Sequence, residues 1–223
     1  MSAPTVYGRR CDLNHPMIVL GGGGHSRVIV EVLRRLGAEI EGYAAPEPAE
    51  PATPLKGVTY LGDDDALEFH PSDVLLANGV GSAKTLTRRI DVFARFVRAG
   101  FRFATLVHPA AVVAEDVTLG QGAQVMAGAI LQPGCRIGEN AIINTGAVVD
   151  HDCVVGAHTH IAPGATLCGG VTVSEAVLIG VGACIGPNIA VGAGSVVGAG
   201  AAVVSAVGEG ATVTGVPARK AER

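Results

Sequence analysis

The chain has 223 residues, enough for one large domain or two small ones, and its 48% hydrophobic and 16% charged residues exclude a disordered protein. The formal net charge of −4 and the lack of a long basic run argue against nucleic acid as a partner. No apolar stretch reaches the roughly 18 residues of a membrane span, and the first twenty residues lack the apolar core of a signal peptide, so we expect a cytoplasmic protein without a membrane partner.

The first half of the chain has the pattern of a small parallel α/β domain. An apolar run, Met17–Leu20, ends in four glycines, and apolar residues then recur at helical spacing until Gly37, which is expected to end a helix. Alternation of strands and helices predicts a parallel sheet. The further elements expected are strands at residues 39–43 and 74–77, a helix at 83–99, a strand within 101–106, and a proline-rich loop at 44–54.

A six-residue period dominates the second half. From Val113 to Val203 every sixth residue is aliphatic, a second column four residues further on is mostly small, and glycine often follows the aliphatic residue. This period fits neither an amphipathic helix nor an alternating strand. It predicts a solenoid of about five coils with short strands on its faces, stacked aliphatic side chains inside, and glycines in turns with unusual backbone angles. The sixteen residues of this aliphatic column are Val113, Leu119, Val125, Leu131, Ile137, Ile143, Val149, Val155, Ile161, Leu167, Val173, Ile179, Ile185, Val191, Val197 and Val203.

The five cysteines form an odd set without CxxC spacing. This pattern favours neither a disulfide nor a metal site, and it predicts reduced thiols that fill the core of a cytosolic protein. We therefore expect no metal cofactor. The residues are Cys11, Cys135, Cys153, Cys168 and Cys184.

The glycine-rich loop at residues 21–24 precedes the first helix, and backbone N–H groups at the start of a helix can hold a phosphate. It is not a full GxGxxG motif, and the sequence Tyr43-Ala44-Ala45-Pro46 puts no acidic residue for a ribose at the end of the second strand. A dehydrogenase is therefore disfavoured. A phosphate site and a merely tight strand-to-helix turn both stay open.

Six short motifs are distinctive beyond the repeat itself. They are Gly21-Gly22-Gly23-Gly24-His25-Ser26, His108-Pro109, Asn144-Thr145, Val149-Asp150-His151-Asp152-Cys153, His160-Ile161-Ala162-Pro163-Gly164 and Gly215-Val216-Pro217-Ala218-Arg219. With these motifs the chain resembles, over nearly its whole length, bacterial acyltransferases of the left-handed β-helix superfamily that act on nucleotide-linked amino sugars, a branch that includes a sialic acid O-acetyltransferase subgroup. The resemblance implies a Rossmann-like α/β domain with a small parallel sheet at residues 1–107, which binds the nucleotide sugar. It implies a left-handed parallel β-helix with a C-terminal tail at 108–223.

The resemblance also implies roles for the candidate site residues. His151 is the general base that takes a proton from the acceptor amine, and Asp152 orients its ring. His160 and the main-chain N–H of Gly169 lie at the acetyl-CoA thioester, where the N–H stabilises the oxyanion. On the residues alone, a solvated corner His151, a structural His160 and a turn-forming Asn144 are the alternatives. The tail residues that cover coenzyme A are Gly215, Pro217 and Arg219, and the substrate-binding residues are Gly22, Gly23, Gly24, His25, Ser26 and Asn144.

The expected function is transfer of an acetyl group from acetyl-CoA to the 4-amino group of a GDP- or UDP-linked 4-amino-4,6-dideoxyhexose, such as a perosamine- or bacillosamine-type sugar. The resemblance implies a homotrimer with its active sites between subunits. An O-acetyltransferase of sialic acid or a related sugar would use the same histidine. A non-catalytic solenoid scaffold is the alternative from another class.

Overall fold

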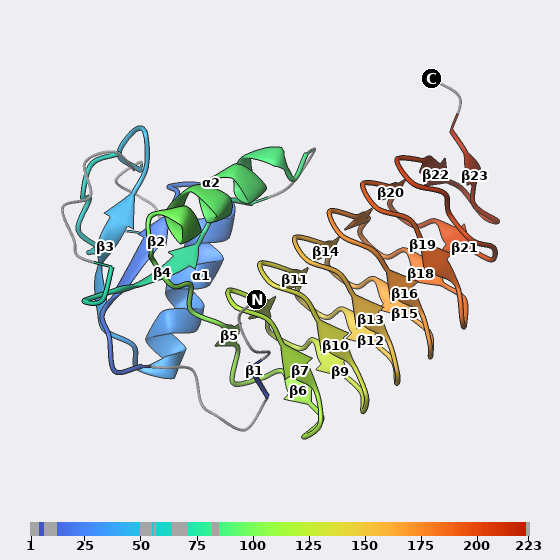
Figure 1. The fold of residues 1–223 in the computed structure, drawn as a ribbon, viewed down its shortest axis with the longest axis horizontal. Helices are drawn as coiled ribbons and strands as arrows, with labels where there is room; N and C mark the ends of the chain where they lie inside the picture. Colours follow the sequence, from blue (N-terminus) through green and yellow to red (C-terminus); the bar gives the residue numbers. More distant parts are fainter. Residues whose placement is uncertain are drawn as a thin grey trace. The chain divides into compact units, whose positions relative to one another are not determined.

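The structure, a computed structural model, describes residues 5–6, 13–49, 55, 57–63, 71–81 and 85–221. The chain forms two compact units (Figure 1). One runs from Arg10 to Pro109, and the other contains Ala110–Arg223 together with the N-terminal strand β1 (Thr5–Val6). The sequence places the boundary between residues 107 and 108.

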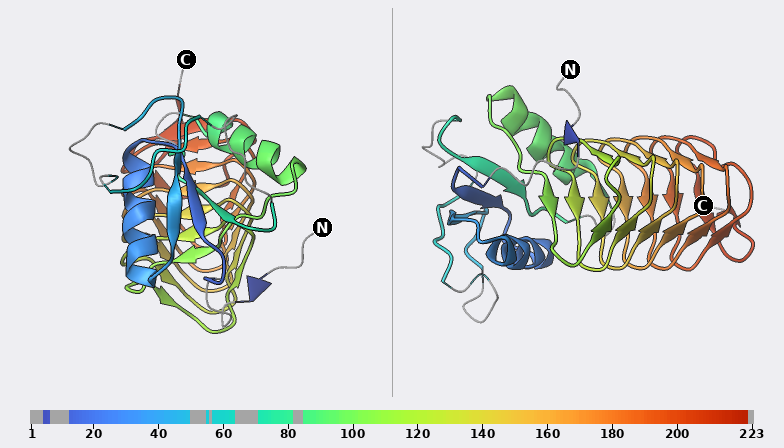
Figure 2. Two further views of the ribbon diagram at one scale, coloured as in Figure 1. Left: turned by 90° about the vertical axis from the view of Figure 1, so that its left-hand side faces the viewer. Right: turned by 90° about the horizontal axis from the view of Figure 1, so that it is seen from below.

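The first unit is built on a parallel sheet in the order β3-β2-β4, with α1 on one side and α2 on the other (Figure 2). The predicted alternation of strands and helices is confirmed, with one difference. The strand expected within residues 101–106 is reduced to a single bridge between Leu76 and Phe103, followed by the short strand β5. The elements are β2 (Met17–Leu20), α1 (Gly24–Leu36), β3 (Ile40–Ala44), β4 (Leu75–Asn78), α2 (Thr87–Arg98) and β5 (Leu106–Val107).

Local sequence explains how these elements end and pack. Gly37 adopts the left-handed conformation at φ 70° and donates its N–H to the carbonyls of the last turn of α1, as predicted for a C-terminal glycine. Helix α2 buries Phe93 and Phe96, and the Phe93 ring lies 4.5 Å from that of Phe103. By contrast, residues 110–223 contain no Phe, Tyr or Trp, so the interior of the second unit is built from aliphatic and small side chains.

The second unit is a left-handed parallel β-helix of about six coils (Figures 1 and 2). Its strands pair in parallel with those one coil away, and β1 pairs antiparallel with β7 at one edge. The first face contains β7 (Thr118–Leu119), β10 (Arg136–Ile137), β13 (Val154–Val155), β16 (Thr172–Val173) and β19 (Ala190–Val191). The second contains β8 (Gln124–Val125), β11 (Ile142–Ile143), β14 (His160–Ile161), β17 (Leu178–Ile179), β20 (Val196–Val197), β22 (Thr212–Thr214) and the antiparallel β23 (Arg219–Lys220). The third contains β6 (Val112–Val113), β9 (Ile130–Leu131), β12 (Val148–Val149), β15 (Thr166–Leu167), β18 (Cys184–Ile185) and β21 (Ala202–Val203).

The aliphatic column lies inside this β-helix, as predicted. Fifteen of its sixteen residues are at most 3% exposed, and only Val113, in the first coil, is half-buried. Each buried side chain contributes roughly 1.5–3 kcal/mol before the cost in chain entropy is subtracted. This stack, repeated along the axis, stabilises the corners on which the polar residues stand.

The role predicted for the glycines that follow the aliphatic residues is wrong. Gly138, for example, does not have a positive φ, and a Cβ there would stand 2.5 Å from the backbone nitrogen of Ala157 in the next coil. These glycines let neighbouring coils approach each other. Left-handed angles occur two residues further on, at the second residue of most turns, which is glycine at Gly122 but Asn140 and Asp152 elsewhere.

The cysteines follow the prediction only in part. Cys135 and Cys153 are fully buried in the column of small residues. Cys168 is half-buried and Cys184 is exposed, because both occupy outward-facing positions of the repeat, so the prediction of core thiols is wrong for these two. The four are free thiols, and Cys11 lies outside the described residues.

Candidate active site

His151 lies at an exposed corner of the β-helix. It is the first residue of the turn between β12 and β13, and its side chain is 61% exposed. Its Nδ1 lies 2.9 Å from Oδ2 of Asp152, the second residue of the turn. Because an ionised carboxylate can only accept, Nδ1–H donates to Asp152 and Nε2 keeps its lone pair. An imidazole held in this way can take a proton at Nε2.

Two carboxylates increase the basicity of this ring. Asp152 has a φ of 58°, and this left-handed conformation carries its carboxylate back to the imidazole. Asp150 accepts the main-chain N–H of His151 at 2.8 Å. The hydrogen bond that the ring donates to Asp152, followed by the charge of Asp150, raises the pKa of His151 above its ordinary value.

Replacing Asp152 by asparagine is expected to lower the pKa of His151, because the amide can still accept from Nδ1 but has no charge. A base must be unprotonated to act, so the acid limb of the kcat profile should move to lower pH, with a loss of kcat smaller than the roughly 10²-fold expected without the base. The fold should persist, since Asn140 and Asn188 adopt the same backbone conformation in equivalent turns. An acid limb that does not move, measured from pH-dependent kcat, would contradict this assignment.

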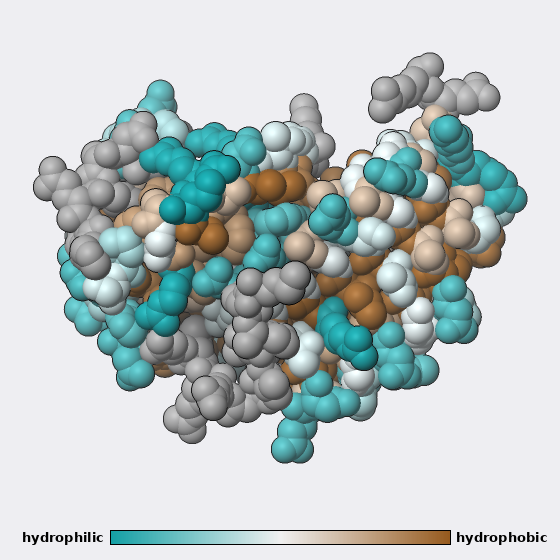
Figure 3. Space-filling view, in the orientation of Figure 1, coloured by the Kyte–Doolittle hydropathy of each residue, from teal (hydrophilic) through white to brown (hydrophobic). Residues whose placement is uncertain are grey.

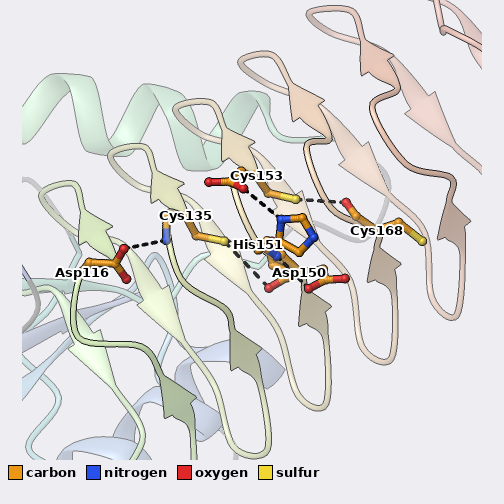
Figure 4. A network of polar contacts seen from close by, with 9 residues as sticks. Asp116, Cys135, Asp150, His151, Cys153 and Cys168 are labelled. Atoms are coloured by element: carbon orange, nitrogen blue, oxygen red, sulfur yellow. Dashed lines mark hydrogen bonds and ion pairs between the residues drawn. The ribbon is translucent and has the colours of Figure 1, made fainter.

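Buried thiols hold the backbone under this turn (Figure 4). Cys135, inside the preceding coil, donates from Sγ to the carbonyl of Asp150 at 3.0 Å. Cys153 donates to the carbonyl of Cys168 at 3.2 Å, in the coil that follows. The turn that carries His151 is therefore fixed to the interior of the β-helix on both sides, although its side chains are exposed.

A second polar pair lies on another face of the β-helix. Asn144, just after β11, places Nδ2 2.9 Å from Nε2 of His160, the first residue of β14. The Asn144 Oδ1 accepts the N–H of Thr145 at 2.8 Å, so Nδ2 is the donor and the His160 Nε2 is the acceptor. His160, the histidine of this pair, is buried, with 8% of its surface exposed. His160 and His151 stand on different parts of the same coil, one on β14 and one before β13.

The tail residues form an exposed hairpin at the C-terminal end of the β-helix. Gly215 and Pro217 lie in the turn between β22 and β23, and Arg219 is the first residue of β23. The Ala218 N–H donates to Ala202 O at 2.7 Å, which attaches the hairpin to the last coil. Along the second face, β22 is three strands beyond β14, a rise of about 14 Å at the usual spacing.

In the first unit, the predicted glycines form the link from β2 to α1. Gly23 is the N-cap of α1, Gly24 begins the helix, and both are exposed, whereas Gly22 and His25 are half-buried. Ser26 is fully buried, and its hydroxyl donates to Gly79 O at 3.0 Å, so this side chain ties two loops together.

Sequence reasoning missed the second of these loops, Gly79–Gly81, which follows β4. A Cβ on Gly81 would stand 3.2 Å from that of His25, so the two loops lie against each other at the carboxyl ends of β2 and β4. The chain order changes direction between these strands, and ligands of open parallel sheets bind at such a point. The buried Arg89 donates to Asn78 O and Val80 O, and burial lowers the pKa of Arg89 to about 9. The sequence did contain a signal for this loop, because the two glycines Gly79 and Gly81 follow the buried strand β4 closely.

Two classes of feature are absent from the described residues. No group of three or more His, Cys, Asp or Glu side chains is placed to hold a metal ion within the ranges that the structure covers. In that same part of the chain, no helix combines the length and the apolar character needed to cross a membrane.

Comparison with known proteins identifies the family. The bacterial transferase hexapeptide family, in its six-repeat form, matches residues 116–151 and 134–169. No curated protein matches the chain. The acetyltransferase domain of PglB from Neisseria gonorrhoeae is 33% identical over 93% of this chain and 100% of that chain, with a TM-score of 0.85, and it has been solved with acetyl coenzyme A.

A second similar structure is PerB from Caulobacter crescentus, in complex with CoA and GDP-perosamine. It is 35% identical over 99% of this chain and 100% of that chain, with a TM-score of 0.83. The perosamine N-acetyltransferase of that organism has also been solved with a histidine replaced by asparagine. The chain is therefore an enzyme that uses acetyl-CoA, and it belongs to the bacterial sugar N-acetyltransferases of the left-handed β-helix, hexapeptide-repeat superfamily.

Proposed function

We propose that this enzyme acetylates the 4-amino group of a 4-amino-4,6-dideoxyhexose carried by GDP or UDP, such as a perosamine- or bacillosamine-type sugar, in the cytoplasm and for polysaccharide biosynthesis. The observation that carries the proposal is the exposed His151 imidazole, whose Nδ1 is held by Asp152 and whose Nε2 can take a proton. The similarity to PerB, which binds GDP-perosamine, supports a GDP-linked sugar. The structure of the PglB domain was solved with acetyl coenzyme A and does not distinguish the two nucleotides, so a UDP-linked sugar is the other choice.

In the proposed reaction the sugar amine attacks the carbonyl carbon of the acetyl thioester directly. As the C–N bond forms, Nε2 of His151 takes a proton from the amine nitrogen. The main-chain N–H of Gly169 donates to the carbonyl oxygen while it carries negative charge. The C–S bond then breaks, CoA leaves as the thiolate, and it receives the proton from His151. No side-chain nucleophile is required, because the amine is itself the nucleophile.

Coenzyme A is proposed to lie along the β-helix axis. Its thioester would stand near Gly169 and His160, and the exposed Gly215, Pro217 and Arg219 would cover the distal part. The separation of about 14 Å between β14 and β22 along the axis suits an extended ligand that reaches from one to the other.

The nucleotide sugar is proposed to bind the carboxyl end of the small sheet. Gly22 and Gly23 precede α1, and Gly24 and His25 begin it. The first turn of this helix contains no acidic residue that would repel a phosphate. Ser26 contributes by holding the neighbouring Gly79 loop. Asn144, whose amide contacts His160, is proposed to meet the sugar.

The proposal includes a homotrimer with active sites between subunits. Apolar residues are visible along the β-helix in Figure 3. The exposed valines of this unit include Val112, Val181 and Val204. Burial of such surfaces favours association. Analytical ultracentrifugation should give three times the chain mass of 22.4 kDa, and a monomer at micromolar concentration would contradict this part of the proposal.

A thiol-release assay tests the proposed substrate. Purified protein is mixed with acetyl-CoA and with GDP- and UDP-linked 4-amino-4,6-dideoxyhexoses, each matched by the 4-hydroxy sugar on the same nucleotide. We expect release of CoA with one amino sugar and not with its hydroxy counterpart. Turnover of sialic acid but of no amino sugar would favour the O-acetyltransferase, and failure to bind CoA would revive the scaffold interpretation.

A further inference from the structure

The ring of His151 lies directly against Gly169, one coil further along the same corner. The N–H of Gly170 donates to His151 O at 2.9 Å, which joins the two turns. A Cβ built on Gly169 would stand 2.5 Å from Nε2, 2.6 Å from Cε1 and 3.1 Å from Cδ2 of His151. Its three nearest atoms all belong to the imidazole, and two of the distances are shorter than real Cβ atoms show. Figure 4 shows the ring directed toward the coil that carries Cys168.

The backbone does not require glycine at this position. Gly169 lies outside the left-handed region, so any residue could adopt its conformation. Gly169 is the first residue of its turn. In the other turns of the repeat, the residue at the equivalent position has a side chain. These residues are Glu115, Gln121, Ala127, Pro133, Glu139, Thr145, His151, Ala157, Pro163, Glu175, Val181, Pro187, Ala193 and Ala199. The one glycine in this column thus stands where the imidazole needs room.

The preceding coil gives Asp152 similar room. A Cβ on Gly134 would stand 2.5 Å from Oδ1 of Asp152, although glycine is also favoured there by its φ of 80°. The His151–Asp152 pair therefore lies between two glycines, one in each neighbouring coil. Of the two, Gly169 is the informative one, because only the ring explains it.

We propose that Gly169 is a positioning residue: the absence of its side chain gives the His151 imidazole the place where Nδ1 meets Asp152 and Nε2 faces the acceptor. An alanine at 169 would push the ring off this place and break its hydrogen bond to Asp152. This role is additional to the main-chain N–H of Gly169 and rests on the proposed function only where it concerns turnover. The groups that raise the pKa of the ring are Asp152 and Asp150 of its own turn, with a smaller contribution from Cys135 of the preceding coil.

The test compares Gly169→Ala with Gly208→Ala, a glycine of the same β-helix with nothing within 4 Å of a built Cβ and no positive φ. Titration of His151 by NMR should show its pKa lowered toward the ordinary value in Gly169→Ala and unchanged in Gly208→Ala. The kcat of Gly169→Ala should fall roughly 10- to 10²-fold, as expected for a displaced base. An unchanged His151 titration in Gly169→Ala would overturn the inference whatever the turnover.

A double-mutant cycle with His151→Ala separates this role from the other functions of Gly169. With the ring removed, alanine at 169 has room, so Gly169→Ala should cause no further loss of kcat and no further fall in melting temperature. The melting-temperature comparison holds even if the single Gly169→Ala variant folds poorly. Equal effects of Gly169→Ala with and without the imidazole would overturn the inference. A lowered pKa with unchanged turnover would support the positioning role and contradict His151 as the base.

Discussion

His151→Asn is expected to lower kcat by roughly 10²-fold or more while leaving oligomeric state and CoA binding unchanged. A sugar amine must lose a proton as it attacks the thioester, and asparagine cannot take one. The fold should not suffer, because the side chain is 61% exposed and its stabilising contacts are with its own turn. Steady-state kinetics at saturating concentrations of both substrates measure the effect. Retention of more than half of the wild-type turnover would contradict the assignment of the base.

His160→Asn is the matched comparison for this prediction. The Nε2 of His160 already accepts a hydrogen bond from Asn144, so it is not placed to take a proton from an amine. We expect a loss of about 10-fold if His160 positions the thioester. A larger loss at His160 than at His151 would exchange the two roles.

Val155→Asp is expected to abolish folding of the β-helix at ordinary temperature. Val155 is 1% exposed and pairs with Ile137 and Val173 in the coils on either side. An unpaired carboxylate in this stack costs several kcal/mol, a large part of the 5–15 kcal/mol that stabilises a typical domain.

The control is Val28→Asp, the same substitution at a valine on helix α1 that is 41% exposed and lies outside the surface proposed to associate, and it should change stability by no more than about 0.5 kcal/mol. Thermal unfolding followed by circular dichroism compares the two variants. Equal melting temperatures would contradict the inward direction of the column.

The fold could be read from the sequence because its information is periodic. A residue's face follows from its place in the hexad, and Val113 departs from the pattern only because it lies in the first coil. The purpose of the glycines could not be read in this way. Gly138 and Gly122 are the same residue type in the same repeat, but their roles differ. Gly138 permits the close approach of a neighbouring coil, whereas Gly122 adopts a left-handed backbone conformation, and only the structure distinguishes the two roles.

Contacts within the candidate site could be predicted from the sequence where the residues are adjacent in the chain, as for His151 and Asp152. The pairing of Asn144 with His160 needed the register between coils, which stacks residues far apart in the chain. The Gly79–Gly81 loop of the first unit belongs to no repeat, and its contact with Ser26 depends on how β2 and β4 pair. The buried Arg89, which donates to Asn78 O, also lies outside any repeat. Site residues in irregular parts of a fold are therefore harder to predict from the sequence than site residues in a repeat.

The central claim is that this enzyme joins an acetyl group to a nitrogen of a nucleotide-linked sugar. It is tested most directly by NMR of the product formed from acetyl-CoA labelled with carbon-13 at the acetyl group and a GDP- or UDP-linked 4-amino-4,6-dideoxyhexose. We predict an amide carbonyl coupled to the 4-amino nitrogen, formed by the wild type and at a rate roughly 10²-fold lower by His151→Asn. An ester carbonyl on a sugar hydroxyl, or no labelled sugar at all, would contradict the claim.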